Sequence, residues 1–229
     1  MDLKLKKLED IRGPIYIFIL FVTALLGSCN VILFLLPLAF LAPKVWRSCM
    51  DKIVGIWTTV PIILNEYLYG IRVHVTGDVI HGDEWSLMIM NHRTSLDWLF
   101  LWTALYKMDP WLLVTEKISL KKPLKRIPGA GWAMECGNFL FLRRDWEHDK
   151  QHIQDTIQYF ADEGNSYQIL FFPEGTDMTD RSRRLSKKYA QENNLPQLEY
   201  VLYPKTTGFS FVVQKLKESK IILLNSTPV

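Results

Sequence analysis

The chain has 229 residues and a net charge of +3, and 48% of its residues are hydrophobic. This length allows one sizeable core with an appendage, and the modest charge leads us to expect no nucleic-acid partner. Cys29, Cys49 and Cys136 lack the spacing of metal ligands, which argues against a zinc site and against a disulfide framework.

The N-terminal part has the composition of a membrane segment. Residues 13–43 contain no Asp, Glu, Lys or Arg, and this run exceeds the roughly 20 apolar residues that span a bilayer. It is longer than the apolar core of a signal peptide, so we expect a retained segment that Pro37 and Pro43 kink or end. Basic residues flank both ends, so the positive-inside rule gives no orientation.

A second apolar stretch, from Ile53 to Tyr69, allows two interpretations. Trp57, Tyr67 and Tyr69 suit a membrane interface, but an ordinary core helix would have the same pattern. We therefore predict that residues 1–70 form a membrane-embedded helical segment with one helix or a two-helix motif.

From residue 71 onward the pattern becomes that of an α/β domain. In chain order it predicts strands at 72–77, 86–90 and 111–115 with a helix at 95–106, and then strands at 139–142 and 168–172 with a helix at 149–163. Such alternation predicts an α/β fold with a buried mixed sheet over residues 71–229.

One polar motif follows the strand predicted at 86–90. Asn91 and His92 end an apolar run, and Asp97 lies about one helical turn further on. An aspartate in that position can accept from one ring nitrogen of His92 and leave the other free to act as a general base. The pair alone is a weak signal, because a structural histidine would give the same pattern.

Two further segments carry polar side chains at strand ends. Gly137 begins a strand that ends at Arg143, whose planar guanidinium suits a phosphate group. The turn Phe172-Pro173-Glu174-Gly175-Thr176 follows the last predicted strand. Because sites in α/β sheets form from loops at strand ends, we expect His92 and Glu174 to face one cleft.

Together these motifs resemble the glycerophospholipid acyltransferases, the family of 1-acylglycerol-3-phosphate acyltransferases. His92 and Asp97 match the H-x4-D motif, Gly137 to Arg143 match G-x-x-F/L-x-x-R, and Phe172 to Gly175 match F-P-E-G. Three motifs in the right order behind an apolar segment are a specific signal.

Longer runs are similar to the lysocardiolipin acyltransferase branch of that family. These runs lie at residues 89–94, 97–102, 128–134, 173–177 and 200–209, and the resemblance extends from about residue 13 to 218. Ile221–Val229 does not match, so we expect a C-terminally truncated form of such a protein.

The resemblance implies acyl transfer from coenzyme A to a hydroxyl of a lysophospholipid. The implied acceptors are lysocardiolipin, lysophosphatidylinositol, lysophosphatidylglycerol and lysophosphatidic acid. Acyl-CoA would be a co-substrate, with no further cofactor and no metal. The same resemblance implies an integral protein of the endoplasmic reticulum membrane, or of mitochondria-associated membranes, in contact with anionic lipid.

Residue roles carry over from the resemblance in the same way. His92 and Asp97 would be catalytic, and Asn91, Arg143, Glu174, Gly175 and Thr176 would bind substrate. Glu174 would accept a hydroxyl or position Arg143, or else only stabilise its turn. The alternatives for the whole chain are an inactive lipid-binding form and an acyl-CoA thioesterase.

Three remaining features have two interpretations each. The basic clusters at 117–126 and 181–188 would attract anionic headgroups or coenzyme A phosphates, or would be solvated faces. Cys136 would be a nucleophile in an acyl-enzyme route, but a lone cysteine is more often a small buried hydrophobic residue.

Overall fold

The computed structural model describes the backbone of residues 2–219 and the side chains from residue 11 to 219. The described chain forms two compact units. The first comprises the residues up to His81 together with Leu101–Thr115 and Lys121–Phe139, and the second comprises Gly82–Phe100, Glu116–Leu120 and the residues from Leu140 onward. The domain boundary that we expect near residue 70 stays a prediction. Ile221–Val229, where the resemblance stops, lie outside the described residues.

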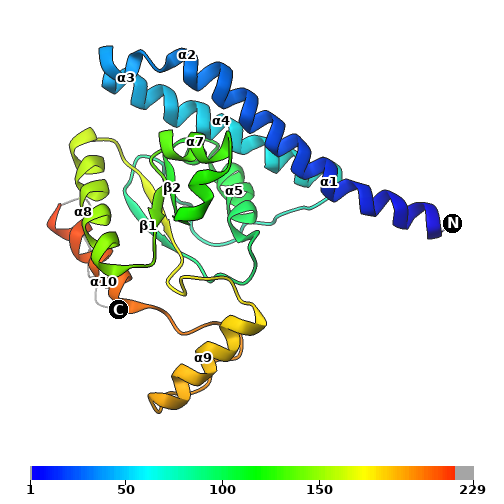
Figure 1. The fold of residues 1–229 in the computed structure, drawn as a ribbon, viewed down its shortest axis with the longest axis vertical. Coiled ribbons are helices and arrows are strands. Elements are labelled where there is room, and N and C mark those ends of the chain that lie inside the picture. The colour runs from blue at the N-terminus through cyan, green and yellow to red at the C-terminus, as the bar shows by residue number, and fades with distance from the viewer. Residues whose placement is uncertain (1, 220–229) are drawn as a thin grey trace. The chain divides into compact units, whose positions relative to one another are not determined.

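The first unit begins with a helical hairpin (Figure 1). Its segments are α1 (Asp2–Leu26), the π-helical η1 (Gly27–Ile32), α2 (Leu33–Leu35), α3 (Leu38–Leu41) and α4 (Pro43–Tyr69). Helices α1 and α4 are antiparallel. The Trp57 indole N–H donates to the Thr23 hydroxyl at 3.2 Å, and the Tyr16 and Tyr69 rings meet edge-on with centroids 5.8 Å apart.

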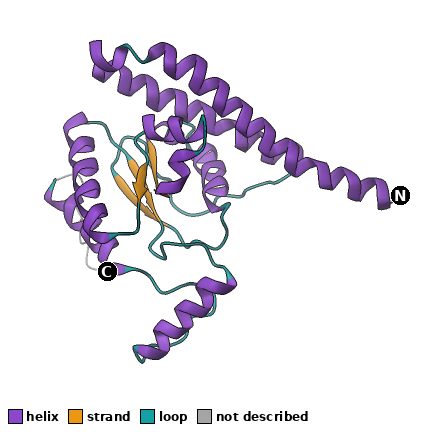
Figure 2. Cartoon of the chain, in the orientation of Figure 1, coloured by secondary structure: helices purple, strands orange, loops and turns teal. Residues whose placement is uncertain are grey.

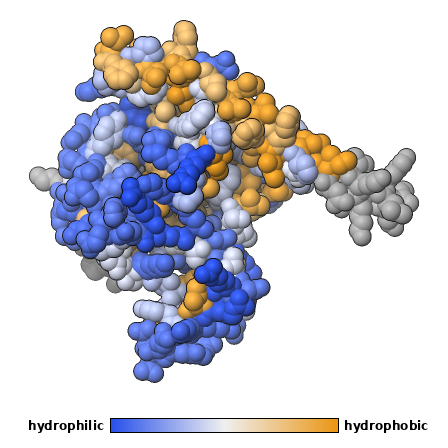
Figure 3. All heavy atoms as spheres, viewed as in Figure 1, coloured by the Kyte–Doolittle hydropathy of each residue, from blue (hydrophilic) through white to orange (hydrophobic). Residues whose placement is uncertain are grey.

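Within the described residues, one helical stretch is long and apolar enough to cross a membrane, namely Ile11–Leu35. Most of its side chains are not buried in the structure, and Figure 3 shows a broad apolar surface over the N-terminal helices. The stretch is shorter than the 13–43 expected from composition, because Leu36 and Pro37 form a turn and Pro43 begins α4. A signal sequence or the core helix of a soluble protein can have the same length and apolar composition, so these two properties alone are weak support for a membrane segment.

Helix α4 has a buried face, as a core helix would. Arg47 and Asp51 form a buried ion pair at 2.5 Å, and Arg47 also donates to the Cys136 carbonyl at 2.7 Å. A Cβ at Gly55 would lie 2.8 Å from the Val114 Cα, so this glycine permits a close helix contact. The opposite face remains exposed, and Tyr67 is 83% accessible. The interfacial role of the exposed aromatic residues stays a prediction.

The second unit is built on a sheet with the strand order β1-β4-β2-β3. The strands are β1 (Ser86–Ile89), β2 (Glu116–Lys121), β3 (Leu140–Leu142) and β4 (Gln168–Phe171). Strand β4 pairs in parallel with β1, which places Ile89 opposite Phe171, and also in parallel with β2. The α/β class with an N-terminal helical segment is therefore confirmed, and the mixed character of the sheet stays a prediction.

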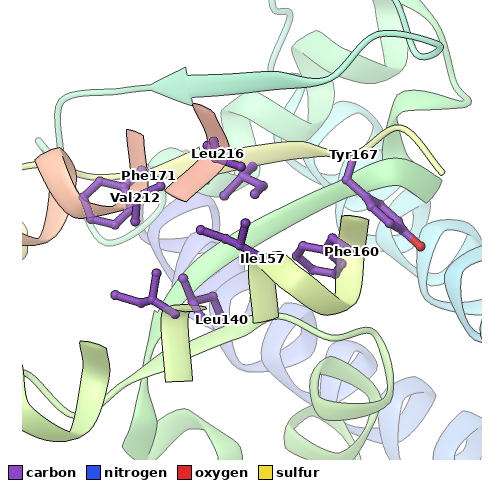
Figure 4. Packing of buried hydrophobic residues seen from close by; sticks show 9 residues of the cluster. Leu140, Ile157, Phe160, Tyr167, Phe171, Val212 and Leu216 are labelled. Atoms are coloured by element: carbon purple, nitrogen blue, oxygen red, sulfur yellow. The ribbon is translucent and has the colours of Figure 1, made fainter. Parts of the chain in front are cut away.

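Two helices complete the core of this unit (Figure 2). Helices α8 (Trp146–Glu163) and α10 (Thr206–Glu218) contribute apolar side chains that meet those of β3 and β4. Figure 4 shows Ile157 and Phe160 of α8 close to Leu140, Tyr167 and Leu216. Phe160 and Leu216 are 2% and 1% exposed, so burial of these rings and branched chains stabilises the unit.

The strands predicted at 86–90, 139–142 and 168–172 form with small shifts at their ends, as do the helices predicted at 95–106 and 149–163. The first helix is α5 (Asp97–Met108). The strand predicted at 72–77 is wrong, because this segment is irregular.

The strand predicted at 111–115 is also wrong, because α6 (Leu112–Thr115) is helical. Asp109 accepts from the Trp111 amide at 2.9 Å, and Pro110 follows it. An acidic cap followed by proline is a helix start signal. The elements absent from the sequence prediction are β2, the short helices η2 (Lys122–Arg126) and α7 (Ala130–Cys136), and α9 (Asp180–Glu192) and α10.

Candidate active site

The parallel pairing of β1 and β4 brings two of the predicted motifs together. Ile89 is opposite Phe171, and the chain continues from these residues to His92 and to Glu174 over the same number of positions. Both loops leave the same edge of the sheet, because carboxyl ends of parallel strands coincide. All seven candidate residues belong to the second unit.

His92 and Asp97 are in direct contact. The Nδ1 atom of His92 lies 3.1 Å from Oδ2 of Asp97, and both side chains are largely shielded from solvent. The same oxygen accepts from the Thr94 amide at 2.8 Å, so the carboxylate is fixed at the start of α5. Asp97 therefore favours the tautomer with the proton on Nδ1 and leaves the Nε2 lone pair available. Within residues 2–219, Nε2 of His92 has no hydrogen-bond partner.

A ring stack also restricts the orientation of the His92 imidazole. It stacks on the ring of Phe172, with centroids 4.3 Å apart and an interplanar angle of 28°. The backbone carbonyl of His92 accepts from the Met178 amide at 2.9 Å. The loop after β1 is thus attached to the segment that follows the Phe-Pro-Glu-Gly turn.

Glu174 is an unusual member of this site because it is almost fully buried. It is 5% exposed, and within the described chain its Oε2 atom has no hydrogen-bond partner. Burial raises the pKa of the Glu174 carboxyl, while hydrogen bonds from the backbone amides of Leu202 and His92 act in the opposite direction. The site therefore holds a buried carboxyl with a raised pKa next to the histidine.

The turn that carries Glu174 depends on glycine. Gly175 has a φ of 69°, which a residue with a side chain rarely adopts. The Gly175 amide donates to the Phe172 carbonyl at 3.0 Å, and the Lys205 amide donates to the Pro173 carbonyl at 2.8 Å. These bonds close the turn and fix the position of the buried carboxyl.

A second arginine, missed by the sequence prediction, connects β3 to this turn. The guanidinium of Arg144 donates to the Gly175 carbonyl, whereas the Arg143 side chain is exposed and bonds to no other described residue. Asp149 accepts from the amides of both arginines, at 2.8 Å from Arg143 and 2.7 Å from Arg144. Arg143 remains available to a ligand, and Arg144 is the structural link. Only the doubled Arg-Arg after the strand could have signalled the second role.

Asn91 and Thr176 are the remaining candidates. Asn91 is exposed, and the Thr176 hydroxyl donates to Asp177 at 3.2 Å. In residues 2–219 no cluster of His, Cys, Asp and Glu could hold a metal ion. Cys136 lies in α7 of the first unit. Burial raises the pKa of its thiol, assisted by Glu135 and opposed by Arg47, so its environment disfavours a nucleophilic thiolate.

Comparison with known proteins agrees with the motifs. The family described as Acyltransferase matches residues 72–224. The chain is 42% identical over 216 residues to lysophosphatidylinositol acyltransferase 10 of Caenorhabditis elegans, covering 94% of this chain and 55% of that protein. It is 43% identical over 209 residues to mouse lysocardiolipin acyltransferase 1, with 91% and 55% covered.

A more distant relative is the probable 1-acyl-sn-glycerol-3-phosphate acyltransferase 5 of Arabidopsis thaliana. It is 31% identical over 218 residues, which cover 93% of this chain and 56% of that protein. No solved structure matches. The chain belongs to the acyltransferase family, and the resemblance to lysocardiolipin acyltransferases is confirmed. It spans about half the length of the curated relatives it matches.

Proposed function

We propose that this protein transfers a fatty acyl group from coenzyme A to a hydroxyl of a lysophospholipid. The observation that supports this most directly is the contact between His92 and Asp97, which leaves Nε2 of a shielded imidazole available as a base. Relatives named as acyltransferases of lysophosphatidylinositol and lysocardiolipin support the choice of substrate class.

In the proposed reaction, Nε2 of His92 takes the proton of the acceptor hydroxyl. The resulting oxygen nucleophile attacks the thioester carbonyl and forms a tetrahedral intermediate. The carbon–sulfur bond then breaks, and the leaving thiolate takes the proton back from the imidazolium. Asp97 stabilises the charged imidazole during these steps, and a well-placed base of this kind contributes about 10²–10⁴-fold to the rate.

The other residues would bind the acceptor. Arg143 is exposed, precedes the arginine that bonds to the Phe-Pro-Glu-Gly turn, and has a guanidinium suited to the acceptor phosphate. Glu174, Gly175 and Thr176 would position the glycerol part, with the Glu174 carboxyl contacting a hydroxyl. Asn91 would contribute from the loop after β1. We place the reaction at the endoplasmic reticulum membrane, with the apolar stretch Ile11–Leu35 as the anchor.

The test is acyl transfer from labelled oleoyl-coenzyme A in membranes that carry the 229-residue chain. The acceptors are lysocardiolipin, lysophosphatidylinositol, lysophosphatidylglycerol and lysophosphatidic acid, each assayed with the wild type and with His92→Ala. Product that depends on both His92 and an added acceptor supports the proposal and identifies the acceptor. Release of free fatty acid without dependence on an acceptor would favour a thioesterase. No product from folded protein would favour a lipid-binding form.

A further inference from the structure

A basic cavity in the second unit has no role in the proposed proton transfer or acyl transfer. Its volume is about 390 Å³, and it is lined by Arg93, Met178, Arg183, Lys187, Glu199 and Tyr200. Arg93 follows His92 in the chain, and the Met178 amide bonds to the His92 carbonyl. The cavity wall is therefore continuous with the backbone that holds the candidate base.

Three cations and one carboxylate line this cavity. Arg93 and Lys187 form no ion pair with any described residue, and neither does Arg183. The Arg183 guanidinium instead approaches the Met178 sulfur at 3.3 Å, and a thioether is a weak acceptor. Cations gathered in a cavity without carboxylate partners of their own are suited to an anionic ligand.

The local fold fixes the position of these cations. Helix α9 is capped by Thr179, whose hydroxyl accepts from the Ser182 amide at 3.2 Å. Arg183 and Lys187 are four positions apart on α9 and so lie on one face of the helix. Figure 1 shows α9 projecting from the sheet of its unit, and Figure 3 shows that much of its surface is hydrophilic.

We infer that this cavity binds a phosphate group carried by one of the two substrates, an identification that rests on the proposed function. Arginine forks bind phosphate oxygens in pairs, and lysine adds a point charge. Glu199 would accept a hydroxyl adjacent to the phosphate, and the Tyr200 ring, which is 74% exposed, offers a flat apolar face. Coenzyme A carries phosphates next to a ribose and an adenine, whereas a lysophospholipid carries one next to glycerol.

Helix α9 supplies a matched control. Arg183 and Lys187 line the cavity, whereas Arg184 and Lys188 have the same residue types and spacing but do not line it. The double variants Arg183→Gln/Lys187→Gln and Arg184→Gln/Lys188→Gln remove the same charge from the same helix. Unequal effects of the two variants would therefore report the cavity and not general attraction by a basic helix.

The experiment is calorimetric titration of the detergent-purified full chain with two soluble probes. Adenosine 3′,5′-bisphosphate represents the acyl donor, and glycerol 3-phosphate represents the acceptor. We expect Arg183→Gln/Lys187→Gln to raise the Kd of one probe about tenfold or more, because hydrogen bonds between charged groups are strong. We expect the control variant to change it less than twofold.

Each outcome has a defined meaning. Loss of bisphosphate binding alone assigns the cavity to coenzyme A, and loss of glycerol 3-phosphate binding alone assigns it to the acceptor. Equal effects of the two double variants, or no binding of either probe by the wild type, overturn the inference. The titration requires no turnover, so an inactive chain that shows the expected pattern would contradict the proposed function alone. An active chain whose cavity variant binds normally would contradict only this inference.

Discussion

The imidazole of His92 lies nearly parallel to the ring of Phe172, at a centroid distance of 4.3 Å, while its Nδ1 atom contacts Asp97. The stack restricts rotation of the imidazole, and the carboxylate selects its tautomer. Phe172 belongs to the Phe-Pro-Glu-Gly turn, so one motif orients the base that another motif supplies. The sequence motifs are therefore parts of one structural arrangement.

His92→Ala should abolish lysolipid-dependent transfer and leave membrane association intact. Asp97→Asn should lower kcat by about 10²-fold or more, because the orienting charge is lost while the shape of the side chain is kept. Both rates are measured with labelled acyl-CoA, and both variants are checked for membrane recovery. Transfer that persists in His92→Ala would eliminate this residue as the base.

Phe172→Leu should lower kcat by about 2- to 10-fold with little change in either KM. Aromatic pairs contribute about 0.5–1.5 kcal/mol beyond area burial, and here that contribution favours one ring orientation. Phe172→Tyr keeps a stacking ring and is the matched variant. If leucine and tyrosine have the same effect on kcat, the stack has no orienting role.

Regular apolar patterning predicted β1, β3, β4 and α8 of the second unit, but it missed α9 and α10 and could not predict the strand β2. This strand reads Glu-Lys-Ile-Ser-Leu-Lys, and its Glu116 and Lys117 are both only 2% exposed. Lys117 lies over the Tyr167 ring, with Nζ 5.0 Å from the centroid. Buried charges of this kind depend on partners from distant segments, which local periodicity does not reveal.

The candidate site, like the fold, was only partly predictable from the sequence. The spacing of His92 and Asp97 predicted a contact that the structure shows, because the bend and turn that lead into α5 bring the two side chains together. The role of Arg144 was not predictable, since its bond to Gly175 depends on how β3 and the turn are placed in three dimensions. The burial of Glu174 is likewise a tertiary property.

The two arginines after β3 should behave differently on substitution. Arg143→Gln should raise the KM for the lysolipid more than the KM for acyl-CoA, because its exposed guanidinium is the proposed phosphate ligand. Arg144→Gln should lower kcat and thermal stability, because it removes the bond to Gly175. The backbone bonds to Asp149 are kept in both variants, so the loop itself is retained. Equal changes in both KM values for Arg143→Gln would exclude a specific role in acceptor binding.

Glu174 should make folding stability depend on pH. Burial raises the pKa of its carboxyl above the ordinary value of 4.5, so the folded state binds this proton more tightly than the unfolded state. The associated stability is fully present below the unfolded pKa and is lost as the pH rises through the folded pKa.

Glu174→Gln lacks this titration. As the pH rises from about 4.5, the Tm of the wild type should therefore fall relative to the Tm of Glu174→Gln. Thermal unfolding in one detergent across this range measures the shift, and Glu147→Gln, at an exposed position of α8, controls for net charge. Parallel Tm profiles for Glu174→Gln and the wild type would show that the buried carboxyl does not favour its proton in the folded state.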